Sequence, residues 1–357
     1  MAIDYDRVLH QAIQEIAQNQ KQLHEFLGSE LLDQHVIRKH IETHRKINLN
    51  EFNSDTKIFF GNHLKNVKLA KQSDSYSILE EGFLSNPLDT LPTRCIYFLL
   101  NNDIGQSLEK YKQLYRSRPC SLFIIWDWDS QHWVEMSCNL AAYCDFYIPV
   151  SSEKTYTISH FNPFVLGPIF VGVNQWSRKF ITDNFDSLLL DRQNEPFGPH
   201  VFYEAYPRRN RAIATLNQKF KNITFTNNSY KQTSAIANLN EWSQHKTHWI
   251  IPVLSGMPIR VFNCLCTGGI PVIPSFYKVI FESSGLPKDV FYYDVIDLIE
   301  PDRLQKTANN YFDQQGPSGL IKRIGNFINE YHIDARCESI LELVYKKIFD
   351  LSKLNIN

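Results

Sequence analysis

Two carboxylates and a histidine stand close together in the segment Ile124-Ile-Trp-Asp-Trp-Asp-Ser-Gln-His-Trp133. The apolar run before them predicts a buried strand, so Asp127, Asp129 and His132 would follow its carboxyl end, where α/β proteins bind ligands. A carboxylate or imidazole there can accept the proton of a reacting hydroxyl group, and a carboxylate can instead act as a nucleophile. The alternative is that Asp129 or Ser130 caps a helix, which leaves the rest of the Trp-Asp-Trp-Asp cluster unexplained. We therefore predict a catalytic role for Asp129 and His132, with Asp127 as the third candidate.

A second group of residues is suited to phosphate. The segment Tyr203-Glu-Ala-Tyr-Pro-Arg-Arg-Asn-Arg211 follows an expected strand and precedes an apolar-periodic helix. Arginine binds phosphate oxygens in pairs, and a helix N-terminus adds partial positive charge. Arg208 and Arg209 are candidate phosphate ligands on this basis, and a solvated basic helix start is the alternative. Lys246 stands just before the next expected strand, and a single lysine is more often a surface residue.

The stretch from Gly256 to Ser275 predicts a short helix followed by a buried strand. Pro258 suits the first turn of a helix, and Gly268-Gly269 would end it. The run Ile270-Pro-Val-Ile273 is short and β-branched, as in an inner strand. We expect this unit to bring backbone N–H groups and a helix N-terminus to one sheet edge, where phosphates bind.

The same stretch resembles a known family. Its pattern Arg-Val-Phe-x-x-Leu-x-x-Gly-Gly-Ile-Pro-Val-Ile is similar to the donor-binding segment of GT-B glycosyltransferases, especially the exostosin-like and spore-maturation-like branches. In those families an arginine opens the helix, here Arg260, and an acidic residue that follows holds the ribose of a nucleotide sugar. Asn263 occupies that acidic position, and an amide bonds a hydroxyl without the strengthening that a charge adds.

The resemblance implies a glycosyltransferase that moves a sugar from a nucleotide-activated donor to a hydroxyl of a glycan or glycoconjugate, in bacterial surface polysaccharide synthesis. The donor phosphates would be neutralised by Arg208, Arg209, Lys246 and Arg260. Asn263 and the N–H groups near Gly268 and Gly269 would hold ribose or phosphate. No cofactor is expected beyond the nucleotide sugar as co-substrate.

Three alternatives remain open. Asn263 favours a non-catalytic sugar- or nucleotide-binding relative, and a sugar-nucleotide epimerase shares the same plan of two Rossmann-like domains. The Asp-x-Asp pair of Asp127 and Asp129 raises a metal-dependent GT-A enzyme. The basic motifs lie in the other half of the chain from that pair, which favours basic groups in place of a metal, so no metal site is expected.

The order of expected elements predicts an α/β protein with two Rossmann-like domains facing a cleft, in the GT-B manner, with an N-terminal helical extension and C-terminal helices. We expect a helical segment at 1–50, an acceptor-side domain at 51–175, a donor-binding domain at 176–335, and a final helix at 336–357 that in this family packs back on the first domain. The strands expected in the first domain are Lys57–Phe60, Arg94–Leu100, Ser121–Trp126 and Asp145–Val150.

Composition narrows the function classes. The chain of 357 residues carries a formal charge of −1 from 37 basic and 38 acidic residues, so no global field attracts nucleic acid. The N-terminus has no apolar signal core, and the longest apolar runs are of strand length, which predicts a cytoplasmic protein, with attachment to the inner face of a membrane left open. Seven scattered cysteines argue against a disulfide framework. The oligomeric state is not predicted.

Overall fold

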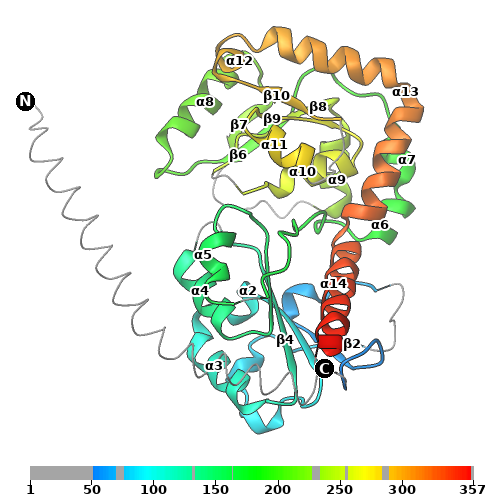
Figure 1. Cartoon of the computed structure of the whole chain (residues 1–357). Helices are drawn as coiled ribbons and strands as arrows, with labels where there is room; N and C mark the ends of the chain where they lie inside the picture. The colour runs from blue at the N-terminus through cyan, green and yellow to red at the C-terminus, as the bar shows by residue number, and fades with distance from the viewer. Residues whose placement is uncertain are drawn as a thin grey trace, which may run out of the picture.

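The computed structural model describes residues 51–69, 76–130, 133–162, 164–226, 234–253, 256–283 and 289–354. The helical segment expected at 1–50 and the candidate base His132 lie outside these ranges. Within them the chain forms two α/β lobes, one above the other in Figure 1. The first lobe is built on β1 to β5 and the second on β6 to β10.

The first lobe contains one parallel sheet of five strands in the order β2-β1-β3-β4-β5. The strands are β1 (Ile58–Phe60), β2 (Tyr76–Ile78), β3 (Ile96–Leu100), β4 (Leu122–Asp127) and β5 (Phe146–Pro149). The helical elements are η2 (Asn62–Leu64), η3 (Phe83–Ser85), η4 (Leu88–Thr90), α2 (Asn101–Ile104), η5 (Gly105–Ser107), α3 (Leu108–Ser117), α4 (Val134–Ala142) and α5 (Thr155–Ser159).

Burial on both faces explains why these strands are continuous apolar runs. All residues of β3 and β4 are buried, as expected of parallel strands with helices on each side. Along β3, Tyr97 and Leu99 join the core that α3 and α4 cover, whereas Phe98 and Leu100 join the core on the opposite face. The four expected strands are present, but the sequence pattern missed β2, whose three residues are all half-buried.

The second lobe repeats this strand order. Its parallel strands are β6 (Gly198–Val201), β7 (Ile223–Thr226), β8 (Thr247–Trp249), β9 (Ile270–Pro274) and β10 (Phe291–Tyr293). One ladder has the order β10-β9-β8, another joins β6 to β7, and a parallel bridge between Phe197 and His248 connects them. The resulting order, β7-β6-β8-β9-β10, confirms the predicted α/β class with two Rossmann-like units.

Helices cover both faces of the second sheet. They are α6 (Arg178–Asp183), α7 (Phe185–Leu188), α8 (Pro207–Asn217), α9 (Ala235–Ser243), α10 (Ile259–Cys266), α11 (Tyr277–Ser283), α12 (Val295–Ile299) and α13 (Asp302–Tyr331). The last of these bends at Gly316, which has a φ of 58°, just before Pro317. Pro317 lacks the N–H that would continue the helical bonding, so the bend falls there.

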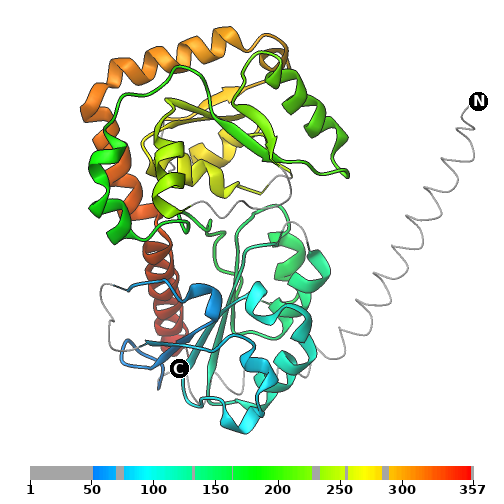
Figure 2. The same cartoon turned by 180° about the vertical axis from the view of Figure 1, so that it is seen from behind.

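The C-terminal helix α14 (Ile333–Leu354) belongs to the first lobe by its packing. Cys337, Ile340 and Val344 lie in the same core cluster as Ile58 and Phe98. In Figures 1 and 2, α13 passes over the second lobe and α14 descends beside the first sheet. The chain therefore crosses between the lobes twice.

The two crossings are bonded to each other. The Val173 N–H donates to the Tyr331 carbonyl, and the Ile333 N–H donates to the Val173 carbonyl, both at 2.8 Å. Gly172 is required here because its φ is 76° and a Cβ would lie 2.1 Å from the Tyr331 oxygen. We call the bonded segments 172–177 and 331–334 the hinge.

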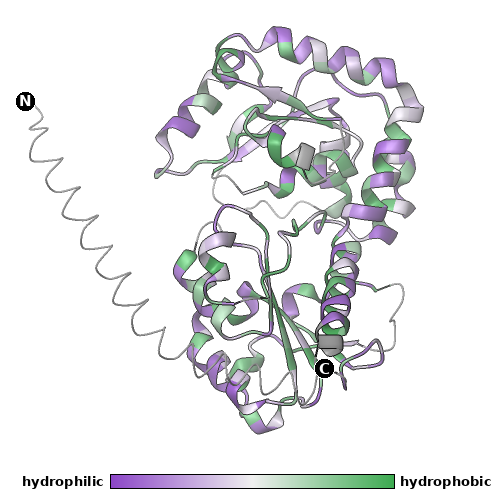
Figure 3. Cartoon of the chain, in the orientation of Figure 1, coloured by the Kyte–Doolittle hydropathy of each residue, from purple (hydrophilic) through white to green (hydrophobic). Residues whose placement is uncertain are grey.

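The hydropathy of the residues agrees with this architecture. In Figure 3 the strands of the first sheet and α10 are mostly green, whereas the first half of α13 is mostly purple. Among the described residues, no helix combines the length and the apolar character needed to cross a membrane.

Candidate functional site

In each sheet the strand order reverses beside the first strand, and the carboxyl ends flanking that reversal are where α/β proteins bind ligands. The reversal lies between β1 and β3 in the first sheet. In the second it lies between β6 and β8, which meet at the Phe197–His248 bridge. We call these two positions the first and second switch points.

The first switch point carries a histidine–aspartate pair. His63 follows β1 in η2, Asp103 follows β3 in α2, and the His63 Nδ1 lies 2.8 Å from the Asp103 Oδ1. A carboxylate only accepts, so Nδ1 carries the proton and a neutral His63 keeps Nε2 free to take another. The side chain of His63 is 47% exposed and that of Asp103 only 2%. The arrangement is that of an accessible base held by a buried acid.

Backbone bonds fix the acid of this pair. Asp103 also accepts the His63 N–H at 3.0 Å and the Leu100 N–H at 2.9 Å. Gly61 makes the approach possible, because a Cβ there would lie 1.7 Å from the Asp103 Oδ2. Asp103 is thereby bonded to the ends of β1 and β3 at once.

The two carboxylates of the Trp-Asp-Trp-Asp cluster point in different directions. Asp127 is 1% exposed and accepts the Ser137 hydroxyl at 2.5 Å, the Asp129 N–H at 2.9 Å and the Tyr147 hydroxyl. Burial raises the pKa of Asp127, against the effect of these bonds. Asp127 thus ties the end of β4 to α4 and β5, and its carboxylate does not reach solvent. Its predicted catalytic role does not fit this position.

Asp129 is half-buried at the carboxyl edge of the sheet. Its Oδ2 accepts the Asn101 amide at 2.7 Å, and the Asn101 Oδ1 accepts the Trp128 N–H at 2.9 Å. Asn101 opens α2, the helix that also carries Asp103. Asp129 therefore shares one edge with the His63–Asp103 pair.

The second switch point carries arginines. Arg209, in the first turn of α8, donates from Nε to the Ile251 carbonyl at 3.0 Å and from Nη1 to the Val201 carbonyl at 2.8 Å. These bonds join the ends of β6 and β8 and use two of the five guanidinium N–H groups. Burial lowers the pKa of Arg209. Arg208 precedes it on the same helix and is exposed.

Arg260 reaches the same place from another helix. It is the second residue of α10 and is half-buried. Burial holds the pKa of His200 well below its usual range, and the charge of Arg260 adds to this shift. His200 lies in β6, and its Nε2 accepts the Ile251 N–H at 3.0 Å. The charges of Arg209 and Arg260 both act on His200, so the structure brings these two together beside the N-termini of α8 and α10, and Arg208 adjoins Arg209 in the first turn of α8.

Lys246 lies at the opposite edge of the second sheet. It directly precedes β8, and its Nζ lies 2.7 Å from the Asp313 carboxylate and 2.7 Å from the Asn194 Oδ1. The structure does not bring Lys246 together with the arginines, because the amino end of a strand lies at the far edge from its carboxyl end.

Gly268 and Gly269 also lie away from the arginines. Their N–H groups donate to the Leu265 and Cys264 carbonyls at 3.0 and 2.9 Å and close the end of α10. A Cβ on Gly268 would lie 2.1 Å from Leu320. These N–H groups are used by the helix end and are packed under α13, so they are not available to ribose or phosphate.

Asn263 lies one turn further along α10 than Arg260 and is 4% exposed. Its amide donates to the Gln175 Oε1 at 2.7 Å, which ties α10 to the hinge. Its own Oδ1 is buried without a hydrogen-bond partner.

The two carboxyl edges face each other across the lobe boundary. Residues 164–169 run parallel to β5, with the Ile169 N–H donating to the Pro149 carbonyl, and lead directly into the hinge. Ile259, at the start of α10, packs against the core of the first lobe. Burial raises the pKa of Tyr277, after β9, and the charge of Glu153, after β5, adds to it. The two switch points thus belong to facing surfaces.

His63 and Asp103 were missed by the sequence reasoning. Neither belongs to a recognisable motif, and 40 residues separate them. A usable indication was present, because Gly61-Asn-His63 and Asn101-Asn-Asp103 each directly follow an expected strand. Both His63 and Asp103 are among the polar residues that directly follow the expected strands.

Comparison with known proteins gives structural likeness alone. No protein-family model matches the chain, and a search of curated proteins finds no match. Among solved structures, the chain resembles an α,α-trehalose-phosphate synthase (UDP-forming) from Burkholderia vietnamiensis, with a TM-score of 0.44 and 9% identity over 73% of this chain and 74% of that one. It also resembles a UDP-GlcNAc 2-epimerase from Neisseria meningitidis bound to UDP-GlcNAc, with a TM-score of 0.36 and 9% identity over 81% and 99%. The two strand orders establish the fold independently of these likenesses.

Proposed function

We propose that this protein is a glycosyltransferase that moves a sugar from a nucleotide-activated donor to an acceptor hydroxyl, with His63 as the general base. The observation that carries the proposal is the pairing of two facing switch points. One holds an accessible histidine oriented by a buried aspartate, and the other holds Arg209 and Arg260 beside two helix N-termini. A base and an anion site on facing surfaces suit the transfer of a group away from a phosphate leaving group.

The first lobe would bind the acceptor. The acceptor hydroxyl would give its proton to the Nε2 of His63 while the hydroxyl oxygen bonds to the anomeric carbon of the donor sugar. Asp103 would hold the imidazole in the required tautomer and stabilise the cation that forms, as the acid of a catalytic triad does. Asp129 would accept a hydrogen bond from another acceptor hydroxyl. His132 stays a candidate for the same work.

The second lobe would bind the donor. As the bond between the anomeric carbon and the phosphate oxygen breaks, its electron pair stays on the nucleotide diphosphate. Arg208, Arg209 and Arg260 would stabilise that developing charge, together with the N-termini of α8 and α10. The proposed donor is a nucleotide sugar, and the proposed acceptor a glycan or glycoconjugate of a surface polysaccharide pathway. A cytoplasmic location, at the inner face of the membrane, belongs to the same proposal.

The test starts with a thermal-shift screen of UDP, GDP, dTDP and CMP, and of their common sugar conjugates. A ligand at about 100 times its dissociation constant adds ~2.7 kcal/mol of stability, enough to be seen clearly. Release of free nucleotide from each binding conjugate is then measured with and without a panel of oligosaccharide acceptors. Acceptor-dependent release that is lost in His63→Ala supports the proposal.

The same screen separates the alternatives. Binding of a nucleotide sugar without release, for every acceptor, would favour a non-catalytic binding protein. Interconversion of the donor sugar without acceptor would favour an epimerase. If no nucleotide or nucleotide sugar binds, the proposed function is wrong.

A further inference from the structure

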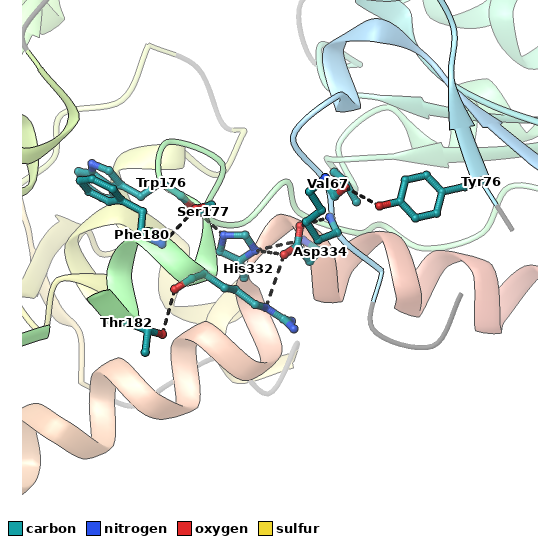
Figure 4. A network of polar contacts seen from close by, with 10 residues as sticks. Val67, Tyr76, Trp176, Ser177, Phe180, Thr182, His332 and Asp334 are labelled. Carbon is teal, nitrogen blue, oxygen red and sulfur yellow. Dashed lines mark hydrogen bonds and ion pairs between the residues drawn. The ribbon is translucent and has the colours of Figure 1, made fainter. Parts of the chain in front are cut away.

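A single buried carboxylate joins the two lobes at the hinge. Asp334, the second residue of α14, is 3% exposed. Figure 4 shows its side chain between groups from both sides of the hinge. A carboxylate removed from water needs partners for its lone pairs, so losing one of the groups around it costs free energy.

The partner from the first lobe belongs to the segment that carries His63. The Lys68 N–H donates to the Asp334 Oδ1 at 3.0 Å. One residue earlier, the Val67 carbonyl accepts the Tyr76 hydroxyl at 3.3 Å. The segment 61–69 is therefore bonded near its start to Asp103, through the His63 N–H, and near its end to Asp334.

The partners on the other side come from the hinge and from the second lobe. The Arg178 Nε lies 3.8 Å from the Asp334 Oδ2, and Arg178 opens α6. The His332 Nε2 lies 2.8 Å from the Trp176 carbonyl and must donate to it, and its Nδ1 lies 3.2 Å from the Asp334 backbone nitrogen and 3.3 Å from the Asp334 Oδ2. Asp334 thus contacts the segment 61–69, its hinge neighbour His332 and Arg178 of the second lobe.

Rotation of the second lobe about the hinge would change the contact between Arg178 and Asp334 before it changed the bond between Lys68 and Asp334. The Arg178 contact joins α6 of the second lobe to α14, whereas the Lys68 bond lies within the first lobe and α14. Buried polar networks of this kind favour discrete arrangements over gradual deformation. A change in the position of Arg178 would therefore be felt at the Asp334 carboxylate and so at the segment 61–69.

We propose that Asp334 is a positioning residue that couples the arrangement of the two lobes to the placement of His63. The carboxylate holds the end of the His63 segment, and Arg178 holds the carboxylate in the lobe arrangement described here. This inference rests on the proposed role of His63 as the base.

The test measures hydrogen exchange by mass spectrometry in the full chain. Arg178→Met keeps much of the apolar volume of the arginine but removes its charge from Asp334. We expect exchange in the segment 61–69 to rise about tenfold, although Arg178 does not touch that segment. Asp183→Asn is the matched control, because it breaks an exposed pair with Lys179 at 2.8 Å on the same helix and should leave 61–69 unchanged.

A second variant separates the two bonds of the carboxylate. Asp334→Asn retains an oxygen that can accept the Lys68 N–H but loses the charge that faces Arg178, so it should behave as Arg178→Met does. Asp334→Ala loses both and should raise exchange in 61–69 further. Exchange that rises only within α6 in Arg178→Met, or rises evenly over the chain in every variant, would overturn the coupling.

Turnover provides a readout that a purely structural role would not move. Once a donor is known, Arg178→Met should lower kcat several-fold with the donor KM unchanged, because the base is misplaced while the donor site is intact. An unchanged kcat would contradict the proposal. If the wild type binds no nucleotide, the proposed function fails, and the exchange experiment still decides whether the hinge is coupled to the His63 segment.

Discussion

In both lobes the first strand of the sheet has its sequence neighbour on one side and the third strand on the other, so each sheet has one switch point. The first holds His63 and Asp103, which contact each other through their side chains. The second holds Arg209, which contacts the carbonyls of Val201 and Ile251. The two sheets share one topology, but the first lobe places a proton acceptor at its switch point and the second lobe places cations there.

The histidines of the two lobes make the same contrast. His63 is 47% exposed and bonded to a carboxylate, whereas His200 is fully buried and bonded at both ring nitrogens to backbone atoms. A side chain whose ring atoms are both used by the backbone holds strands together, and one with a free ring nitrogen can do chemistry. The hydrogen-bond partners of a histidine therefore decide its role.

The largest effect is expected at the first switch point. His63→Ala should lower acceptor-dependent turnover by about 10²–10⁴-fold, the usual contribution of a general base. Nucleotide binding, measured by thermal shift, should stay the same, because the donor site lies in the other lobe. Asp103→Asn should lose activity too, since an amide that donates to Nδ1 would leave the proton on Nε2. Full activity in His63→Ala would show that the first switch point does not supply the base.

A second effect separates the two carboxylates of one motif. Asp127→Ala removes the acceptor of Ser137, Tyr147 and the Asp129 N–H, so the free energy of unfolding should fall by about 2–4 kcal/mol. Asp129→Asn, which keeps an oxygen for Asn101, should cost less than about 1 kcal/mol. Urea unfolding of both variants measures the difference. Equal losses would mean that Asp129 is as structural as Asp127.

The donor side is tested by cations at opposite edges of the second sheet. Arg260→Ala should weaken nucleotide binding by about 10- to 100-fold, the range for a lost charged hydrogen bond. Lys246→Ala should change it by less than about twofold, because the Lys246 charge is already paired with Asp313. Isothermal titration of both variants with the nucleotide found in the screen decides the matter. The reverse ranking would place the donor at the edge of the sheet that carries Lys246.

The smallest effect concerns pH. Burial keeps the pKa of His200 well below its usual range, so His200 stays neutral in the folded state, while the unfolded chain takes up a proton near pH ~6.5. Below that pH the unfolded state binds more protons, and stability should fall by up to about 1.4 kcal/mol per pH unit for this group. Thermal unfolding between pH 7.5 and 5.5 should show a shallower loss in His200→Gln than in the wild type. An identical slope would show that His200 is not held neutral.

Local pattern predicted most of the fold. The apolar runs at Ile96–Leu100, Leu122–Asp127 and Ile270–Pro274 are buried strands as expected, and the short helix expected at Pro258 is α10. Local pattern missed β2 and the first half of α13, because three half-buried residues and a polar helix lack a clear apolar period. These elements are stabilised by their neighbours rather than by their own sequence.

The candidate site was predicted less completely. Arg208, Arg209 and Arg260 were found because each opens a helix, and a helix start has local markers. Lys246 was grouped with them from the family resemblance. Gly268 and Gly269 were grouped with them because they close the helix that Arg260 opens, although a helix and the strand after it run in opposite directions across a sheet. The N-terminus of α10 and the glycines at its end therefore lie at opposite edges.

The amino-acid sequence by itself determined two parallel sheets, the helices that cover them and the residue types at the strand ends. Tertiary structure alone decided which of those residues meet. His63 and Asp103 are 40 residues apart, and Asp334 bonds to the backbone 266 residues away. The tertiary structure also decided which polar groups are already hydrogen-bonded within the protein, such as the Asp127 carboxylate and the Gly268 N–H. The reason is that a hydrogen bond depends on distance and burial, and for residues far apart in the chain only the folded packing sets either one.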